Sequence, residues 1–219
     1  MTEASTSDPR MDPALGAGET AVVLIDLQNE IIRNTSNPFY ASIAEQVEQT
    51  GLVARTKALV DHARAVGAPV FWVTVVRRRD YADVVNQITQ LTADGKAPPA
   101  KQQVSLIEGT PGARLVDELV PADGDYLIVK KRRGAFLGTD LEFHLRSRGI
   151  RNLVISGVAT DLGVENTVRD AWDRDYNVVV VEDLCVAAPP TAHEHAIRSV
   201  FPRMARIMTA EQVMRELGR

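Results

Sequence analysis

The sequence lacks the means to form an internal disulfide, because Cys185 is its single cysteine. It also lacks any apolar run near the roughly 18 residues that a membrane-spanning helix needs. Its first residues contain no apolar core of the kind found in secretion signals, so we expect residues 1–19 to form a flexible arm. Together these absences predict a cytoplasmic protein without a membrane partner.

Excess charge is small as well. The 25 Lys and Arg residues nearly balance the 29 Asp and Glu residues, which gives a net charge of −4 at pH 7. This balance argues against a nucleic-acid partner, which a strongly basic protein would favour. With 219 residues, 45% of them hydrophobic, the chain can bury a core of its own. We therefore predict one domain over residues 20–219.

Motifs for metals and cofactors are missing too. The chain has no HExxH, no CxxC and no P-loop, and its glycine-rich stretch at residues 16–19 precedes a strand instead of following one. His193 and His195 stand two residues apart on a predicted helix, so they do not share a face. We therefore predict that the protein needs neither a metal nor a cofactor.

The chain does contain six short apolar runs, rich in Val and Ile and without strict alternation, which is typical of strands buried on both faces. They span residues 21–27, 69–76, 125–130, 152–158, 176–182 and 205–208.

Helical patterns separate most of these runs, including residues 50–66 and 162–173. Helix-start signals of the capping-box type occur at residues 139–142, 191–194 and 209–212. The alternation predicts an α/β fold with a mainly parallel sheet and helices on both faces. Two stretches, about 30–48 and 77–111, show no pattern. The second is long enough to be a lid or an oligomer contact.

Polar side chains follow the carboxyl ends of the predicted strands, where open parallel sheets bind ligands. Asp26 interrupts the first run, and a buried carboxylate needs a cation or a shifted pKa. Lys130 ends the third run and is its natural partner. A loop-capping aspartate and a lysine extended along a strand end would explain the same two residues.

Two further features lie at these strand ends. The basic runs at 77–79 and 130–133 suit an anionic substrate or a partner's carboxylates, although such runs are more often solvated. The turn from Gly157 to Gly163 opens a helix, and its backbone N–H groups suit an anion or an oxyanion.

Nearly the whole chain after residue 20 resembles the isochorismatase-like hydrolase superfamily. The resemblance is carried, in order, by VVLIDLQNE (22–30), VKKRRGAFLGTDLEFHLRSRGI (129–150), LVISGVATDLGVENTVRDAWDRDYNVVVVEDLC (153–185) and PRMARIMTAEQV (202–213). It implies a three-layer α/β/α sandwich around a six-stranded, mainly parallel sheet. It also implies a homodimer or homotetramer, and a cis peptide bond between Val158 and Ala159.

Most members of this superfamily cleave C–N bonds with an Asp, Lys and Cys triad. The aspartate of the DLQN motif matches Asp26, and the lysine six residues before the phenylalanine of GAF matches Lys130, with Lys131 as the neighbouring alternative. The cysteine of the GVATxxCVExT motif falls on Gly163 here. Without that thiol no thioacyl intermediate can form, so the usual amidase route is in doubt.

The leading interpretation is therefore a small-molecule hydrolase of the isochorismatase type, which cleaves a vinyl ether or a related bond by acid–base chemistry without a cysteine nucleophile. Asp26 is then the general acid or base, and Lys130 pairs with it and stabilises negative charge. The backbone N–H groups of Ala159 and Gly163 form a cradle for an oxyanion. The remaining substrate contacts are assigned to Gln28, Thr160 and Arg77, the last of them toward a carboxylate of an anionic substrate. The alternatives are an amidohydrolase that uses directly attacking water, and a non-catalytic binding protein.

Overall fold

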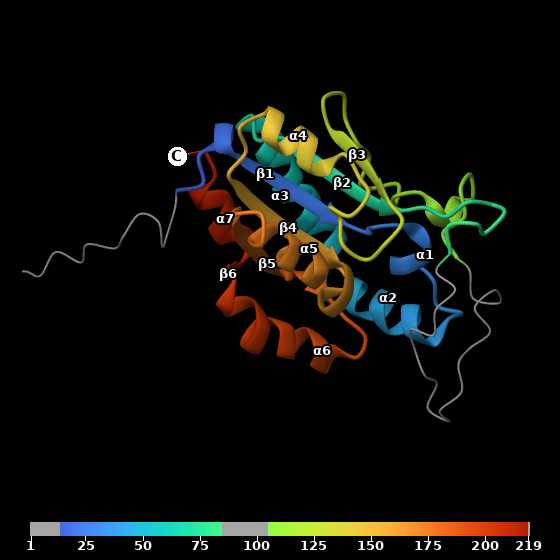
Figure 1. Cartoon of the computed structure of the whole chain (residues 1–219). Coiled ribbons are helices and arrows are strands. Elements are labelled where there is room, and N and C mark those ends of the chain that lie inside the picture. Colours follow the sequence, from blue (N-terminus) through green and yellow to red (C-terminus); the bar gives the residue numbers. More distant parts are fainter. Residues whose placement is uncertain (1–13, 85–104, 219) are drawn as a thin grey trace, which may run out of the picture.

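A computed structural model describes residues 14–84 and 105–218. Its centre is a six-stranded parallel sheet in the order β3-β2-β1-β4-β5-β6 (Figure 1). The strands are β1 (Thr20–Ile25), β2 (Val70–Val75), β3 (Tyr126–Lys130), β4 (Asn152–Val158), β5 (Asn177–Val186) and β6 (Ala205–Met208). Each strand lies on one of the six predicted apolar runs. The predicted α/β fold is confirmed.

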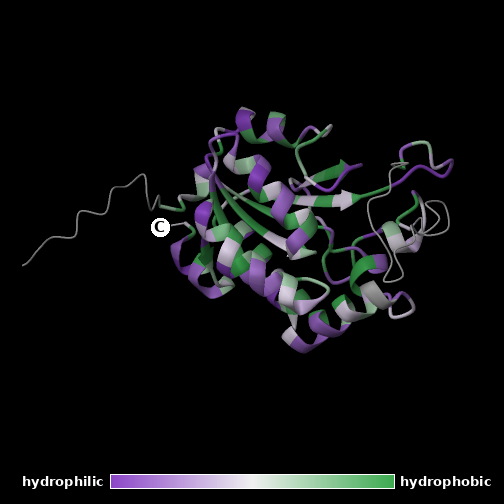
Figure 2. Cartoon of the chain, turned by 60° about the horizontal axis from the view of Figure 1, so that its bottom comes forward, coloured by the Kyte–Doolittle hydropathy of each residue, from purple (hydrophilic) through white to green (hydrophobic). Residues whose placement is uncertain are grey.

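Helices cover both faces of the sheet and complete the three-layer sandwich. They are α1 (Asn29–Ile32), α2 (Pro38–Thr50), α3 (Leu52–Ala65), α4 (Leu141–Ser147), α5 (Glu165–Trp172), α6 (Pro190–His195) and α7 (Ala210–Glu216). Val22 and Leu24 of β1 face a core shared with α2, α3 and α7, whereas Val23 and Ile25 face a second core shared with α4 and α5. Figure 2 shows the resulting pattern, with apolar strands between helices that are polar on the outside.

The two stretches without a sequence pattern turned out differently. The interpretation of residues 30–48 as irregular was wrong, because α1 and α2 occupy most of them. Of the described side chains of α2, only Ile43 and Val47 are buried, so the apolar signal is sparse. Residues 85–104, the middle of the suggested lid or contact, lie outside the described part of the chain.

The predicted helix starts were right in part. Thr209 and Gln212 form the expected capping box of α7. The other two boxes were wrong: α6 begins at Pro190, and Asp140 caps α4 without a side-chain hydrogen bond. The hydroxyl of Thr139 donates to the carbonyl of Ala135 and accepts the N–H of Leu141 at 3.3 Å, so it contacts the first residue of the helix without being its N-cap.

The N-terminal segment that was predicted to be a flexible arm is described only in part. Residues 1–13, most of the predicted arm, lie outside the described part. From residue 14 onward the chain packs on the domain, and Leu15 is 1% exposed. No helix in the described part is long and apolar enough to cross a membrane.

The sheet order creates a switch point between β1 and β4, because the chain builds outward from β1 in one direction and then restarts at β4 in the other. Gly157 of β4 lies so close to β1 that a Cβ there would be 2.1 Å from the carbonyl oxygen of Ile25. Ligands of open parallel sheets bind beside such a point, at the carboxyl ends of the strands. The carboxyl ends of β1 and β4 therefore locate the candidate site.

Candidate functional site

Asp26 stands directly after β1, at the switch point. Its backbone has a φ of 57°, in the left-handed region, and its N–H group donates to the carbonyl of Val73 at 2.8 Å. Non-glycine residues are uncommon in this conformation, although Asp adopts it more readily than most. The turn holds the carboxylate inside the protein, where the side chain is 9% exposed.

Lys130 reaches Asp26 from the end of β3, across β2. Its Nζ lies 2.8 Å from Asp26 Oδ2 and donates to the carbonyl of Arg133 at 2.7 Å. The side chain is 2% exposed, and an ammonium group has three donors, so one N–H remains for a ligand. Lys131 instead pairs with Asp83 at 3.0 Å and donates to the carbonyl of Val76. The structure thus brings the first of the two adjacent lysines to Asp26.

Gly163 lies against this pair, on a π-helical turn (Thr160–Val164) that leads from β4 into α5. A Cβ on residue 163 would lie 3.2 Å from Asp26 Oδ2, 3.3 Å from Lys130 Nζ and 3.1 Å from Ile25 Cγ2. The position that the resemblance assigns to a nucleophilic cysteine is therefore directly beside the ion pair. Because residue 163 is glycine, no side chain separates the ion pair from this turn.

Burial dominates the electrostatics of Asp26. It raises the pKa of the carboxyl group above the ordinary 3.8, while the Lys130 ammonium and, more weakly, the Arg77 guanidinium oppose the shift. Asp26 Oδ2 bonds to Lys130, but Oδ1 is buried and has no hydrogen-bond partner within the described residues. A carboxyl group in this setting is suited to hold and release a proton.

The amide of Gln28 is committed to the backbone. Oε1 accepts the N–H of Val75 at 2.9 Å, and Nε2 donates to the carbonyls of Val75 at 2.9 Å and Ala113 at 2.8 Å. The residue is fully buried. These bonds favour a structural role for Gln28, joining the end of β2 to a nearby loop, over the predicted contact with substrate.

Thr160 and Ala159 lie on the turn after β4. The peptide bond between Val158 and Ala159 is cis, as the resemblance implied. The carbonyl of Ala159 accepts the N–H groups of Leu162 and Val164, which shapes the turn. The hydroxyl of Thr160 is buried and lies 2.9 Å from Nδ1 of His193 on α6, a partner that the sequence did not indicate. An oxyanion cradle formed by Ala159 and Gly163 remains a prediction.

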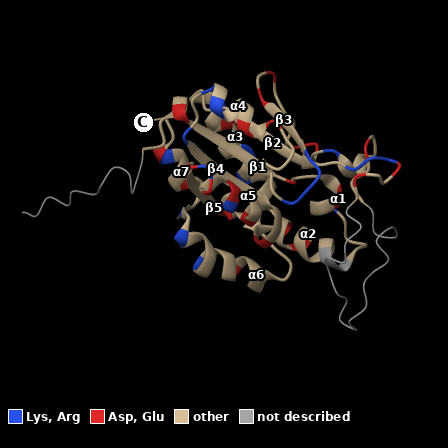
Figure 3. Ribbon diagram, in the orientation of Figure 1, with Lys and Arg blue, Asp and Glu red and all other residues tan. Residues whose placement is uncertain are grey.

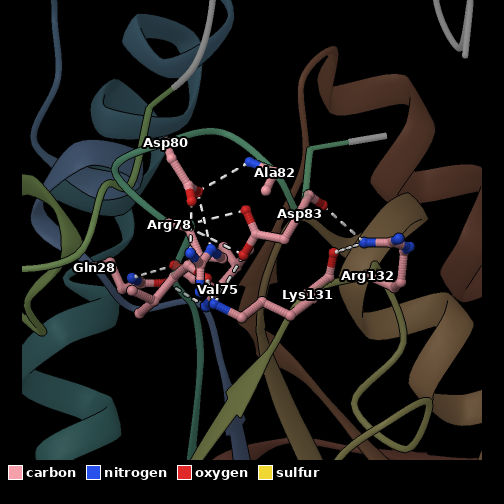
Figure 4. A network of polar contacts seen from close by, with 9 residues as sticks. Gln28, Val75, Arg78, Asp80, Ala82, Asp83, Lys131 and Arg132 are labelled. Atoms are coloured by element: carbon pink, nitrogen blue, oxygen red, sulfur yellow. Dashed lines mark hydrogen bonds and ion pairs between the residues drawn. The ribbon is translucent and has the colours of Figure 1, made fainter. Parts of the chain in front are cut away.

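Basic side chains gather at the carboxyl ends of β2 and β3, as the blue loops in Figure 3 show. Most are bound within the protein. Figure 4 shows Asp83 between Arg78, Lys131 and Arg132, with its carboxylate accepting the Arg78 N–H and its carbonyl accepting from Arg132. Arg77, Arg79 and Arg133 differ, because no carboxylate in residues 14–84 and 105–218 lies within 4.0 Å of their guanidinium groups.

A cysteine nucleophile and a metal ion are two other ways to catalyse hydrolysis, and both would need residues other than Asp26 and Lys130. Cys185 is buried on β5, and burial raises the pKa of its thiol to about 12, so it is a poor nucleophile at neutral pH. Among the described residues, no three His, Cys, Asp or Glu side chains are grouped so that they could hold a metal ion. Independence of metals stays a prediction.

Sequence reasoning missed Thr167 on α5, whose hydroxyl bonds both to the Gly163 turn and to the loop after Lys130. One signal was available, because residues four apart share a helix face and Thr167 follows Gly163 by four positions. The bond to the distant loop had no signal in the sequence.

Comparisons with known proteins find relatives that span most of this chain. A family model described as the Isochorismatase domain matches residues 20–212. The chain is 36% identical over 205 residues to the uncharacterized isochorismatase family protein YecD of Escherichia coli O157:H7. This alignment covers 93% of this chain and 98% of that protein. It is 33% identical over 192 residues to the ureidoacrylate amidohydrolase RutB of Rhizobium rhizogenes, which covers 83% and 76%.

A solved structure supports the same relationship. An isochorismatase family protein from Burkholderia thailandensis superimposes with a TM-score of 0.74 at 29% identity, over 94% of this chain and 99% of that one. Since the family model and the curated relatives both span most of its length, this chain belongs to the isochorismatase family and is a hydrolase.

Proposed function

We propose that this hydrolase cleaves a small vinyl ether by acid–base chemistry at Asp26, without a covalent intermediate. The observation that carries the proposal is the bare face of Gly163 beside Asp26 and Lys130, where a Cβ would lie 3.2 and 3.3 Å from the two side chains. A thioacyl route needs a nucleophile at this position, and glycine supplies none. Residue 163 therefore brings only its backbone to the ion pair, and in the proposed reaction the substrate meets the Asp26 carboxyl group without forming a bond to the enzyme.

In the proposed reaction, protonated Asp26 donates its proton to the terminal carbon of the vinyl ether. The π electrons of the double bond form the new C–H bond, and the ether oxygen shares its lone pair with the resulting cation. Water then adds through its oxygen and returns a proton to Asp26. In the hemiketal that forms, the C–O bond breaks and a proton moves to the departing oxygen, which gives a ketone and an alcohol.

The surroundings of the pair support these roles. Burial raises the pKa of Asp26, which favours the protonated form that a general acid needs. Lys130 bonds to Oδ2 and stabilises the carboxylate that remains after proton transfer. Arg77 lies close enough to lower the pKa of Asp26 and lacks an ion-pair partner in the described residues, so it is assigned to a carboxylate of the substrate.

A second candidate is hydrolysis of an amide by directly attacking water. The similarity to the ureidoacrylate amidohydrolase RutB favours it. Asp26 would then act as an ionised base that takes a proton from water, and Lys130 would stabilise the charge on the tetrahedral intermediate. The two reactions share one site but use opposite protonation states of Asp26.

Turnover in deuterium oxide separates the two. Purified protein is given a carboxylate-bearing vinyl ether, several amides and a ureide, and products are analysed early by NMR. We expect vinyl ether turnover with one deuterium on the new methyl carbon of the product, because the proton on Asp26 comes from solvent. Turnover of the amides or the ureide alone would support the second candidate, and turnover of none would support a binding protein.

Asp26→Asn tests the assigned residue. It should lower the rate by about 10²- to 10⁴-fold, the usual contribution of a general acid. Asp61→Asn is the matched control, because Asp61 is an exposed residue of α3 that pairs with Lys57 and Arg64 of the same helix. A folded Asp26→Asn variant with the normal rate would refute the assignment.

A further inference from the structure

Thr167 of α5 joins the two loops that carry the candidate site. Its hydroxyl donates to the carbonyl of Gly163 at 2.7 Å and accepts the N–H of Ala135 at 3.1 Å. The side chain is fully buried. A hydroxyl has one hydrogen and two lone pairs, so one group makes both bonds at once.

The helix approaches the loop after β3 closely because Gly134 has no side chain. A Cβ there would lie 2.4 Å from Oδ2 of Asp170 and 3.7 Å from the Cβ of Asn166, both on α5. Thr167, on the same helix, therefore reaches the N–H of Ala135 directly. The contact depends on the glycine before Ala135 as well as on the threonine.

These bonds connect the Gly163 turn to the ion pair. From Gly163 the connection runs through Thr167 to Ala135 and back along the chain to Arg133, whose carbonyl accepts Nζ of Lys130 at 2.7 Å. Lys130 bonds to Asp26 at 2.8 Å, and Asp26 lies beside Gly163. Within the described residues, Thr167 is the side chain of α5 that takes part in this connection.

We propose that Thr167 is a positioning residue, which fixes the separation between Gly163 and the Asp26–Lys130 pair. The inference rests on the proposed function of that pair. Without the hydroxyl, the N–H of Ala135 is left buried and without its partner, so the loop shifts to find another one. Lys130 shifts with it, because Nζ bonds to the same loop.

Thr167→Val tests the proposal, because valine keeps the shape and removes both bonds. We expect kcat to fall about 10-fold or more with a smaller change in KM, since small displacements of reacting groups are costly. Thr167→Ser keeps the hydroxyl and should restore most of kcat. Thr56→Val is the matched control, because Thr56 is fully buried on α3 and its hydroxyl has no hydrogen-bond partner among the described residues. If Thr167→Val does not fold, Thr167→Ala takes its place.

A second readout needs no substrate. In a Gly163→Cys, Cys185→Ala background, the rate of alkylation by iodoacetamide reports how close the Lys130 ammonium is to the new thiol, because a nearby cation favours the thiolate. Adding Thr167→Val should slow alkylation at pH 7 several-fold, and Thr167→Ser should not. Unchanged kcat and unchanged alkylation in a folded Thr167→Val protein would overturn the proposal. A failure of the proposed function would show separately, as normal turnover by Asp26→Asn.

Discussion

Replacing Gly163 by alanine tests whether the Asp26–Lys130 pair needs a residue without a side chain beside it. The new methyl group would lie 3.1 Å from Ile25 Cγ2, 3.2 Å from Asp26 Oδ2 and 3.3 Å from Lys130 Nζ. Ordinary contacts between such atoms are about 3.5–4.0 Å, so each neighbour must move by a few tenths of an ångström. The backbone itself accepts alanine, because the φ of Gly163 is not in the left-handed region.

The expected stability change is the balance of two effects. A glycine-to-alanine change at a compatible position stabilises by about 0.4–1 kcal/mol, because the unfolded chain loses freedom. Crowding in a packed interior typically costs about 1–3 kcal/mol. We therefore expect a net loss in the free energy of unfolding of no more than about 2.5 kcal/mol. In a chain of this size that is a fall in Tm of less than about 10 °C.

Activity should fall much further than stability. The methyl group pushes the Asp26 carboxyl group and the Lys130 ammonium from their positions, so we expect kcat/KM to fall at least about 10-fold. Calorimetry gives Tm, and steady-state turnover of a vinyl ether that the turnover assay shows to be a substrate gives kcat/KM. Gly163→Cys adds the same bulk and should also lose this activity. A folded Gly163→Ala protein with normal kcat/KM would refute the idea that the ion pair needs glycine at position 163.

Three further predictions follow from the same geometry. Lys130→Ala should abolish most turnover and lower the free energy of unfolding by about 3–5 kcal/mol, because it leaves a buried carboxyl group without its cation. Lys131→Ala should affect kcat/KM only mildly. A larger loss of kcat/KM in Lys131→Ala than in Lys130→Ala would show that the wrong lysine was assigned. If Asp26 is the acid, kcat/KM should fall as pH rises through a pKa above 3.8, whereas a base would give a rise, so the measured pH profile decides between the two roles. Iodoacetamide should leave wild-type activity intact, because the thiol of Cys185 is buried and its pKa is about 12; inactivation matched by labelling of Cys185 in mass spectrometry would contradict this.

The sequence by itself determined the strands and the fold class. Runs rich in Val and Ile are typical of strands buried on both faces, and the six runs became the six strands of one sheet. The expected burial holds for β1, β2 and β4, whereas the edge strand β3 leaves Leu127 and Val129 exposed. Local signals also placed α3 and the capping box at Thr209. The failures were local too. Among the described side chains of α2, Ile43 and Val47 are the buried ones, and these two gave too weak a periodic signal.

The tertiary structure decided how the site is assembled. Asp26 and Lys130 stand on strands that are separated by β2, so their ion pair depends on the strand order and on the length of the lysine side chain. The amide of Gln28 looked available in the sequence, but the fold uses it to bind the end of β2. The bond from Thr167 to Ala135 joins residues 32 positions apart. Sequence periodicity shows which face of its own helix or strand a residue occupies. Contacts between strand ends depend on how the helices and strands pack against one another, and this packing is known only from the folded chain.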